Sequence, residues 1–524
     1  MSKISLYYHT IRSLKKSQVF NRLRIFFGLG CTLGVSPSKN ITSIQMLESP
    51  KTLDFDPAFL ARFPVKELME NKITILHNSK DFDWRSRWEI TDKSALWNFN
   101  LHYFEFLFPL VKVWKNTSEK RYLNKTIEMI CGWIDNNPKG SYPGWASYTI
   151  ALRIVTWISY YGYVAEALSE DFRKKFLFSL HDQYLYLSTH LEKDILGNHY
   201  FENLKSLVFA ALFFKDSAVV DKALMDFKDE CKEEILTDGM HFELSPMYHK
   251  IIFEGMLRIA AALRGVGQPD KDIESYLQSM LDVAYSFEKG LDRVPLFNDG
   301  GNNVAKSLEA LVATAEMYFG LKPNFKDRFE ASGFYIFNMN SDGKTWKLIV
   351  DAGQPGPKYI PGHAHCDTMS YELFCDGTPV VVNCGTYAYQ CKERSFFRST
   401  AAHNTVMVNG KEQSQCWGAF RVAKRSYTKV NSVTENSITM EMTDAYGQRC
   451  KRTIKIRPDQ IEVTDESPGA KLDAYVHIAA PIKLDGSGDK EVSEQPYAPD
   501  YGLKQNIICY RFRGINRVVH TIEL

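Results

Sequence analysis

The segment Leu321-Lys-Pro-Asn-Phe-Lys-Asp-Arg-Phe-Glu-Ala-Ser-Gly-Phe334 separates two sequence patterns. On its N-terminal side, from 95 to about 320, apolar residues recur every three or four positions. On its C-terminal side, short runs alternate apolar and polar residues between Asp-Gly and Asn-Gly turns. The first pattern is typical of amphipathic helices and the second of half-buried strands. Helices followed by strands predict two domains of different class, one over 93–328 and one over 329–524.

The helical half contains at least seven segments with helical spacing, separated by short loops and without an internal sequence repeat. They cover 118–133, 151–161, 203–214, 219–235, 249–264, 271–289 and 304–319. Such a succession predicts an all-α toroid or solenoid.

The second half contains nine alternating runs, which predict an antiparallel β-sandwich. They cover 345–351, 369–374, 378–383, 404–409, 421–430, 437–443, 447–457, 460–465 and 472–478.

The segment 1–92 begins with a basic and apolar stretch, and its residues 36–92 are expected to wrap the next domain. The basic residues are Lys3, Arg12, Lys15, Lys16, Arg22 and Arg24. Two of these arginines interrupt the apolar run before it reaches the length of a signal sequence, so we expect no clear signal peptide. No uncharged run of 18 residues follows, which predicts no transmembrane helix. The stretch either packs on the main domain or touches a membrane as a basic amphipathic helix.

Composition excludes some functions and leaves others open. Hydrophobic residues make up 44% and charged residues 24% of the 524 positions, as in ordinary globular proteins. The net charge of +2 gives no general argument for binding nucleic acid. Ten cysteines without a Cys-x-x-Cys pair argue against a zinc ribbon or a thioredoxin motif. Six of the ten lie between 366 and 450, where one or two disulfides are an open possibility.

A loop at 355–368 combines three prolines, two glycines, His363, His365 and Asp367. Proline and glycine impose turns, so this segment cannot continue as a helix. If 363–367 runs as a strand, the two histidines and the aspartate share one face. The loop is either a functional site or a structural turn with surface histidines.

Four further polar clusters occur. At 197–203, His199, Glu202 and Asn203 lie one helical turn apart and can face a cleft, and Asn198 either caps this helix or serves the same cleft. The stretch 238–249 places Tyr248 beside a proline, as a packed ring or a functional group. The remaining clusters are 295–303, and 394–405 with Arg398, His403 and Asn404.

Together these pieces resemble the heparinase II/III-like polysaccharide lyases. The matching segments, all in family order, are 97–103, 152–155, 197–203, 238–249, 296–299, 351–353, 362–365, 385–387, 397–399, 403–406 and 413–421. The resemblance implies an α+β multidomain protein, with an incomplete (α/α) toroid followed by an antiparallel β-sandwich and a site between them. It also implies β-elimination on a uronic-acid polysaccharide, an anionic partner, and no organic cofactor.

The resemblance implies roles for individual residues. Asn198 and His199, with help from Arg153, neutralise the uronate carboxylate so that the C5 proton becomes removable. Tyr248 acts as acid, and often as base as well, with His363 as the partner base, while Glu202 supports the helix histidine His199. The matched segments add as substrate-binding candidates Asn100, His102, Asn298, Arg398 and Asn404.

Some members of this family carry a zinc ion in the sandwich. His365 and His403 match two of its ligands, but Asn383 occupies the position of an expected aspartate. A neutral amide oxygen is a weaker ligand, so zinc is an open expectation, with Cys384 as a possible substitute.

Two other functions fit the same residues. A glycuronan C5-epimerase would use the same proton abstraction, and a non-catalytic polysaccharide-binding or assembly protein would use only the groove. The glycan is heparan-like, alginate-like or a bacterial surface polysaccharide. The family points to the periplasm or cell envelope, and a cytoplasmic location stays open.

Overall fold

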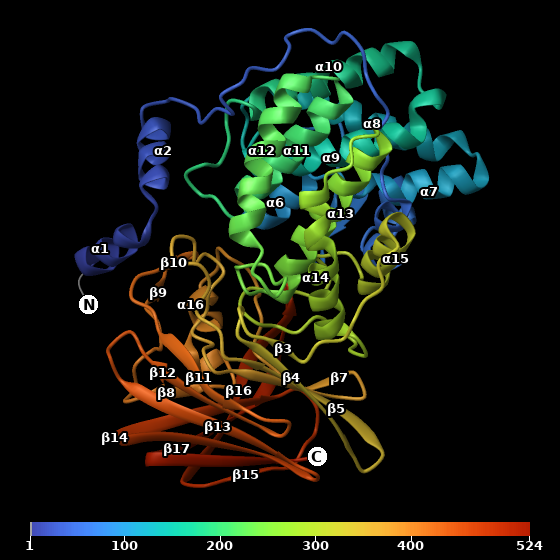
Figure 1. Ribbon diagram of the computed structural model, residues 1–524. Helices are drawn as coiled ribbons and strands as arrows, with labels where there is room; N and C mark the ends of the chain where they lie inside the picture. Colours follow the sequence, from blue (N-terminus) through green and yellow to red (C-terminus); the bar gives the residue numbers. More distant parts are fainter. Residues whose placement is uncertain (1–2) are drawn as a thin grey trace.

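The computed structural model describes residues 3–524 (Figure 1). A helical part packs on a β-sheet part, so the predicted order of helices and then strands is confirmed (Figure 1). The last helix of the helical part ends at Phe319, and Gly320 closes it in the left-handed conformation with φ +69°. The first strand of the sheet part begins at Arg328.

The N-terminal segment forms short elements that lie against the rest of the chain. They are α1 (Lys3–Ser13), α2 (Lys16–Phe26), α3 (Lys51–Asp54), α4 (Pro57–Leu60), α5 (Val65–Met69), β1 (Lys72–Ile75) and β2 (Asn78–Asp81). Between them the extended chain pairs with the helical part, where the Leu33 N–H donates to the Ser188 carbonyl and the Gln45 N–H to the Phe213 carbonyl. Residues 28–50 therefore run over the outside of the helical part (Figure 1).

The helical part contains ten α-helices. They are α6 (Ala95–Leu101), α7 (Leu107–Thr117), α8 (Lys120–Asn136), α9 (Ser147–Val164), α10 (Glu170–Leu187), α11 (Asn198–Phe213), α12 (Ser217–Glu234), α13 (Pro246–Gly265), α14 (Lys271–Glu288) and α15 (Leu308–Phe319). Several begin at a serine or aspartate whose side chain accepts the first free backbone N–H groups, as expected for helix caps: Ser94, Ser169, Asp216, Ser245, Asp270 and Ser307.

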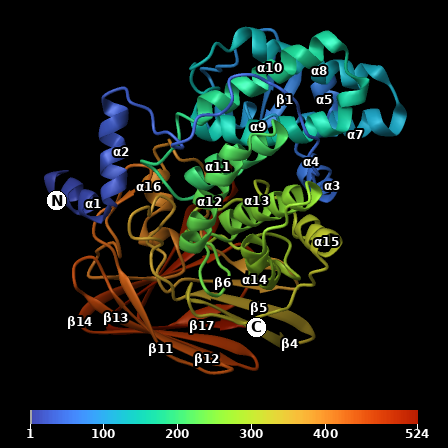
Figure 2. The same ribbon diagram turned by 45° about the horizontal axis from the view of Figure 1, so that its top comes forward.

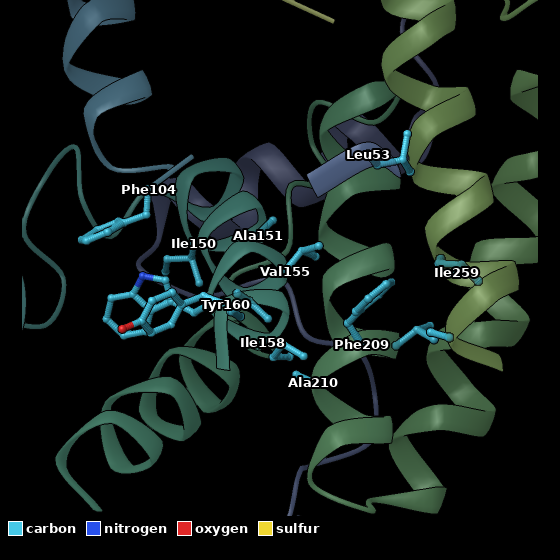
Figure 3. Close-up of a cluster of buried hydrophobic side chains, with 14 of the residues drawn as sticks. Leu53, Phe104, Ile150, Ala151, Val155, Ile158, Tyr160, Phe209, Ala210 and Ile259 are labelled. Carbon is cyan, nitrogen blue, oxygen red and sulfur yellow. The ribbon is translucent and has the colours of Figure 1, made fainter. Parts of the chain in front are cut away.

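These helices pack in sequence around a shared interior. α9 packs on α10 and α11, α11 on α12 and α13, and α14 on α13 and α15 (Figure 2). Figure 3 shows Val155 and Ile158 of α9 beside Phe209 of α11, with Ile259 of α13 beyond them. All four side chains are at most 6% exposed. This chain of helix pairs is the predicted incomplete toroid, held by burial of the apolar faces.

The second part is one antiparallel sheet of thirteen strands that folds into a sandwich. Its strands are β3 (Arg328–Phe329), β4 (Phe334–Ser341), β5 (Lys344–Asp351), β6 (Tyr371–Cys375), β7 (Thr378–Val381), β8 (Val406–Val408), β11 (Tyr427–Val433), β12 (Ser437–Thr443), β13 (Arg449–Arg457), β14 (Gln460–Ile478), β15 (Leu484–Gly486), β16 (Asp489–Asp500) and β17 (Leu503–Glu523). The order along the main path is β11-β12-β13-β14-β7-β6-β5-β4-β3, and β17 pairs with β14. Leu348, Met440 and Val518 from distant strands meet in one buried core.

Long strands at the C-terminal end differ from the prediction. The runs 460–465 and 472–478 belong to the single strand β14, which continues through an irregularity between Ser467 and Lys471. The Ser-Pro-Gly sequence at 467–469 is typical of a turn, but here it forms a bulge that keeps the strand paired with β17. Both β16 and β17 were absent from the predicted runs.

Connecting loops of the sandwich carry short elements near the helical part. They are α16 (Arg394–Phe397) and the paired strands β9 (Cys416–Trp417) and β10 (Arg421–Val422). All ten cysteines are free thiols in this structure, including the six between 366 and 450. From residue 3 onward, the chain has no helix with the length and apolar character needed to cross a bilayer.

Candidate active site

A cavity of about 680 Å³ lies where the two parts of the molecule meet. Its walls come from α1 and α2, from the helical part and from the loops of the sandwich. All five predicted catalytic residues line it together, namely Asn198, His199, Glu202, Tyr248 and His363. These residues are up to 165 positions apart in the sequence, so the fold assembles the site.

Asn198 begins α11 with its side chain free for the cleft. The N-cap of this helix is Gly197, with φ +60°, so Asn198 does not have the capping role considered above. A Cβ at Gly197 would lie 2.8 Å from Oε1 of Glu243, which leaves room only for glycine. The Asn198 Nδ2 lies 3.4 Å from His363 Nε2, and its buried Oδ1 has no hydrogen-bond partner.

His199 follows on the same helix and is paired with a carboxylate. Its Nδ1 lies 2.9 Å from Oε1 of Glu192, and its ring packs on Tyr148 at 4.5 Å between centroids. Burial alone would lower the pKa of His199. The neighbouring Glu192 raises this pKa by more than burial lowers it, so the pKa of His199 lies above its usual value. The imidazole therefore favours the positive charge that binds a carboxylate.

Tyr248 lies in the first turn of α13, which Ser245 caps and Pro246 starts. Its hydroxyl is 2.7 Å from that of Tyr389, which in turn is 2.7 Å from the hydroxyl of Tyr501. Burial, and then the neighbouring Tyr501, raises the pKa of Tyr248 well above the usual value. The resting group is therefore a neutral phenol that can donate a proton.

His363 reaches the site from the opposite side, on the sandwich loop. Its ring lies 4.0 Å from that of Tyr248 between centroids. Its Nδ1 is 3.0 Å from Oδ2 of Asp299. An ionised carboxylate only accepts, so Nδ1 carries the proton and Nε2 keeps a lone pair directed at the cleft.

Asp299 connects the two parts of the molecule and was not among the predicted site residues. It is fully buried and accepts from His363, from His365 at 2.9 Å and from both terminal nitrogens of Arg394. Burial would raise the pKa of Asp299, but Arg394 and the two histidines hold it well below the usual value. A permanently ionised Asp299 therefore fixes the orientation of both histidines.

Glu243 is a second carboxylate that the prediction missed. It is 2% exposed, and neither side-chain oxygen has a hydrogen-bond partner. Its Oε2 lies 3.8 Å from His363 Nε2 and 4.0 Å from His241 Nδ1. When it is ionised, this carboxylate stabilises the imidazolium that forms when His363 takes up a proton.

Comparison with known proteins identifies the family of this chain. The N-terminal model of heparinase II/III matches residues 20–326, and the heparinase II/III-like C-terminal model matches 322–503. The chain belongs to the heparinase II/III-like family. Both halves of the family architecture are therefore present in one chain, in the order that the sequence pattern predicts.

Relatives within the heparinase II/III-like family are distant in sequence. A heparin-sulfate lyase of Pedobacter heparinus is 26% identical over 367 residues, which are 63% of this chain and 54% of that protein. One from Bacteroides stercoris is 23% identical over 409 residues, 68% of this chain and 60% of that protein. The chain thus matches less than two thirds of the length of these relatives. The crystal structure of heparinase III aligns with this chain at a TM-score of 0.68 and 16% sequence identity. The alignment covers 97% of this chain and 89% of heparinase III, so the two proteins share a fold.

The two histidines predicted as zinc ligands lie side by side. The His365 Nδ1 lies 3.1 Å from the His403 Nε2. His365 donates through Nε2 to Asp299 and His403 through Nδ1 to the Ser399 carbonyl, so two lone pairs face each other. Burial lowers the pKa of His365 to about 4 and that of His403 to about 3. Both imidazole rings are therefore uncharged at neutral pH.

These two imidazoles fit a metal cation, but the third donor is weak. Throughout residues 3–524, no three His, Cys, Asp or Glu side chains cluster as metal ligands. The third donor that the resemblance implies is the amide of Asn383. Its Oδ1 already accepts from the Asn404 N–H, and its buried Nδ2 has no partner. Zinc stays a prediction, and a bound ion would tie together the loops that carry His365 and His403.

The loop 363–367 is not a strand, which explains how its histidines separate. β6 begins only at Tyr371, and Met369 has φ +62°. His363 therefore points to the cleft and His365 to His403 without sharing a sheet face. Asp367 accepts from the Asn298 N–H and supports the loop.

Several predicted substrate-binding residues are structural instead. Arg153 is fully buried, donates to Gln183 and to two backbone carbonyls, and stacks on Trp133 at 3.9 Å. His102 is 1% exposed and bonds to the Trp88 carbonyl and the Trp133 indole. Every polar group of both side chains is engaged inside the helical part, so neither is available to a glycan.

The same correction applies to three residues of the domain junction and the sandwich. Asn298 bonds to the Leu244 carbonyl and the His365 N–H. Arg398 donates to the carbonyls of the loops that surround it, including Ala364. Asn404 bonds to backbone groups of β6 and β14. Asn100, by contrast, lines the cleft as predicted.

Glu202 lines the cleft but does not support His199. Its buried carboxylate forms an ion pair with Lys205, and burial raises its pKa. The carboxylate that pairs with His199 is Glu192. The side chain of Asn203, eleven residues later, bonds to the backbone N–H and the carboxylate of Glu192 and holds this residue in place. Sequence spacing along a helix could not identify Glu192, because it lies in the preceding loop.

Other site residues were visible in the sequence only as parts of clusters. Asp299 and Glu243 lie inside segments that match the family pattern, and Arg394 lies in the polar cluster 394–405, but no spacing rule connects them. Tyr389 follows the matched segment 385–387. Tyr501 carried no local signal, because only β-strand pairing brings 498–501 next to 385–389.

Proposed function

We propose that this protein is a polysaccharide lyase that cleaves a uronic-acid glycan by β-elimination. The observation that carries the proposal is the meeting of Tyr248 and His363 from opposite sides of one cleft, with the Asn198 amide beside them. β-Elimination needs an acid, a base and a group that neutralises a carboxylate. The cleft presents all three within contact distance of one another.

The carboxylate of the uronate binds at the start of α11. Its charge must be neutralised before the C5 proton becomes acidic, because the electron pair left at C5 delocalises into the carboxylate. The Asn198 amide can donate one hydrogen bond there, and His199 supplies positive charge, since Glu192 raises its pKa. These groups are already oriented before the substrate arrives.

His363 removes the C5 proton. Its Nε2 lone pair faces the cleft because Asp299 accepts the proton of Nδ1. The imidazolium that forms is stabilised by Asp299 on one side and Glu243 on the other. Because both carboxylates are buried, their effect on His363 is not screened by solvent.

Tyr248 protonates the leaving oxygen. As His363 takes the proton from C5, the electron pair forms the C4–C5 double bond, the C4–O bond breaks, and the phenol proton moves to the departing oxygen. The hydroxyls of Tyr389 and Tyr501 stabilise the resulting phenolate through a chain of hydrogen bonds. A proton from His363 then restores the phenol.

The substrate is an anionic polysaccharide, and the named relatives are heparin-sulfate lyases. Incubation with heparan sulfate, alginate and bacterial capsular glycans tests the proposal through ultraviolet absorbance. A rise on at least one glycan, from the conjugated unsaturated uronate, is the expected result. Deuterium incorporation at C5 without that rise would show the epimerase instead. Binding with neither signal would contradict both enzyme functions.

A further inference from the structure

The helices α1 and α2 display their apolar residues to solvent. Of the 24 large apolar residues that are exposed in residues 3–524, 11 lie between 4 and 29 and 13 elsewhere. In α1 the exposed positions are 4, 7, 8 and 11, which form one helical stripe. In α2 they include Phe20 at 61%, Leu23 at 53% and Phe26 at 81% exposure. Phe27, just after α2, is 72% exposed.

The polar face of α2 is the one that packs on the protein. Gln18 is 1% exposed and donates to the Ile195 carbonyl at 3.0 Å, and Asn21 donates to the Lys193 carbonyl. Lys15 forms an ion pair with Glu233 and lies over the ring of Tyr359. This is the reverse of an ordinary surface helix, whose apolar face packs inward. The polar contacts therefore fix the helix with its apolar face outward.

The charge of residues 3–47 indicates which kind of partner binds the exposed apolar face. Residues 3–47 contain seven lysines and arginines and no aspartate or glutamate. A second copy of the same surface would be repelled by like charge, whereas an anionic lipid surface attracts it. Basic side chains beside exposed aromatic and aliphatic residues are the composition of helices that lie in a membrane interface.

We propose that α1 and α2 dock the protein on an anionic lipid surface. The apolar stripes enter the boundary between headgroups and acyl chains, and the surrounding lysines and arginines bind the headgroups. The same helices form a wall of the cleft, since Thr10, Leu14 and Arg22 line it. Docking therefore brings this wall of the cleft to the lipid surface.

Vesicle co-sedimentation of the full chain tests this proposal. The expected result is binding to vesicles of phosphatidylglycerol and phosphatidylcholine, about tenfold weaker binding to phosphatidylcholine alone, and weakening by salt. Replacing Phe20, Phe26 and Phe27 with serine should reduce binding about tenfold or more. These side chains are outside the cleft, so activity on a soluble glycan should stay unchanged.

Two controls make the outcome decisive. Phe178→Ser changes an equally exposed phenylalanine, at 76%, on α10 and should leave vesicle binding unchanged. Lys3, Arg12 and Lys16 replaced by glutamine should lower binding to anionic vesicles and remove its salt dependence. Failure of the wild-type chain to bind anionic vesicles would overturn the proposal. The proposal would also be overturned if the wild-type chain bound no vesicles and formed a dimer that replacement of Phe20, Phe26 and Phe27 with serine dissociates.

Discussion

At the scale of single residues, the chemistry of the site depends on which side-chain atoms carry a proton. Asp299 fixes the tautomer of His363 and His365 together, and burial keeps Tyr248 a neutral phenol. Acid and base are thereby assigned before a substrate binds, because the surroundings of His363 and Tyr248 differ in charge.

Tyr248→Phe removes the proposed acid and leaves the ring. We expect kcat to fall by about 100-fold or more, as is usual for loss of a general acid. The unfolding midpoint should change little, because the ring still packs on His363. Steady-state kinetics with circular dichroism measures both. Tyr276→Phe on α14, away from the cleft, is the matched control, and an undiminished rate in Tyr248→Phe would contradict the assigned role.

Asn383→Asp restores the carboxylate that the zinc position lacks. A charged oxygen ligand strengthens a site that otherwise holds two imidazoles and an amide. We expect the variant to retain zinc during dialysis against a mild chelator longer than the wild type does. Metal analysis of the dialysed proteins measures the difference. Equal retention in both proteins would show that position 383 is not a ligand.

At the scale of elements, the start of α11 is the most constrained point of the site. Gly197 adopts φ +60° against Glu243 and Ile360, and this turn places Asn198 and His199 at the cleft. The helix itself is almost wholly buried, so it cannot shift to relieve a clash at its first residue.

Gly197→Ala tests this constraint. The new Cβ would lie 2.8 Å from Glu243 Oε1 and 2.9 Å from Ile360 Cδ1, in a backbone region unfavourable for alanine. We expect a loss of about 1–3 kcal/mol in the free energy of unfolding, together with lower activity. Denaturant titration measures the loss. Gly162→Ala on α9 is the control, because nothing lies within 4 Å of its Cβ and it should gain about 0.4–1 kcal/mol.

At the scale of the whole molecule, buried neutral histidines set the dependence of stability on pH. Burial lowers the pKa of His102, His249 and His520 to about 3 and that of His477 to about 4. Between these values and about 6.5, the unfolded chain binds protons that the folded chain does not. The contribution of these histidines to stability is therefore complete above pH 6.5 and is lost as the pH falls.

The expected loss is at most about 1.4 kcal/mol per histidine for each pH unit below 6.5. Burial raises the pKa of Glu230 to about 9, and this group acts in the opposite direction, since the folded chain keeps a proton that the unfolded chain releases. Denaturant titrations at pH 7.5, 6.0 and 5.0 measure the net effect. Stability that is flat or rises on acidification would contradict this balance.

The sequence by itself determined the division into helices and strands, and it predicted Asn198, His199, Tyr248 and His363, which line one cleft. Periodicity and turn residues are local properties, and the segments that match the family pattern are collinear, so both can be read along the chain. The change of pattern at 321–334 was sufficient to place helices before it and strands after it.

Only the tertiary structure decided which polar residues serve the site. Arg153 and His102 looked available in the sequence, but helix packing buries them and engages their polar groups. Asp299, Glu243 and Tyr501 gained their positions when the two parts docked, bringing together atoms that are distant in sequence. The outward apolar face of α2 was decided in the same way, because the partners of Gln18 and Lys15 lie far along the chain.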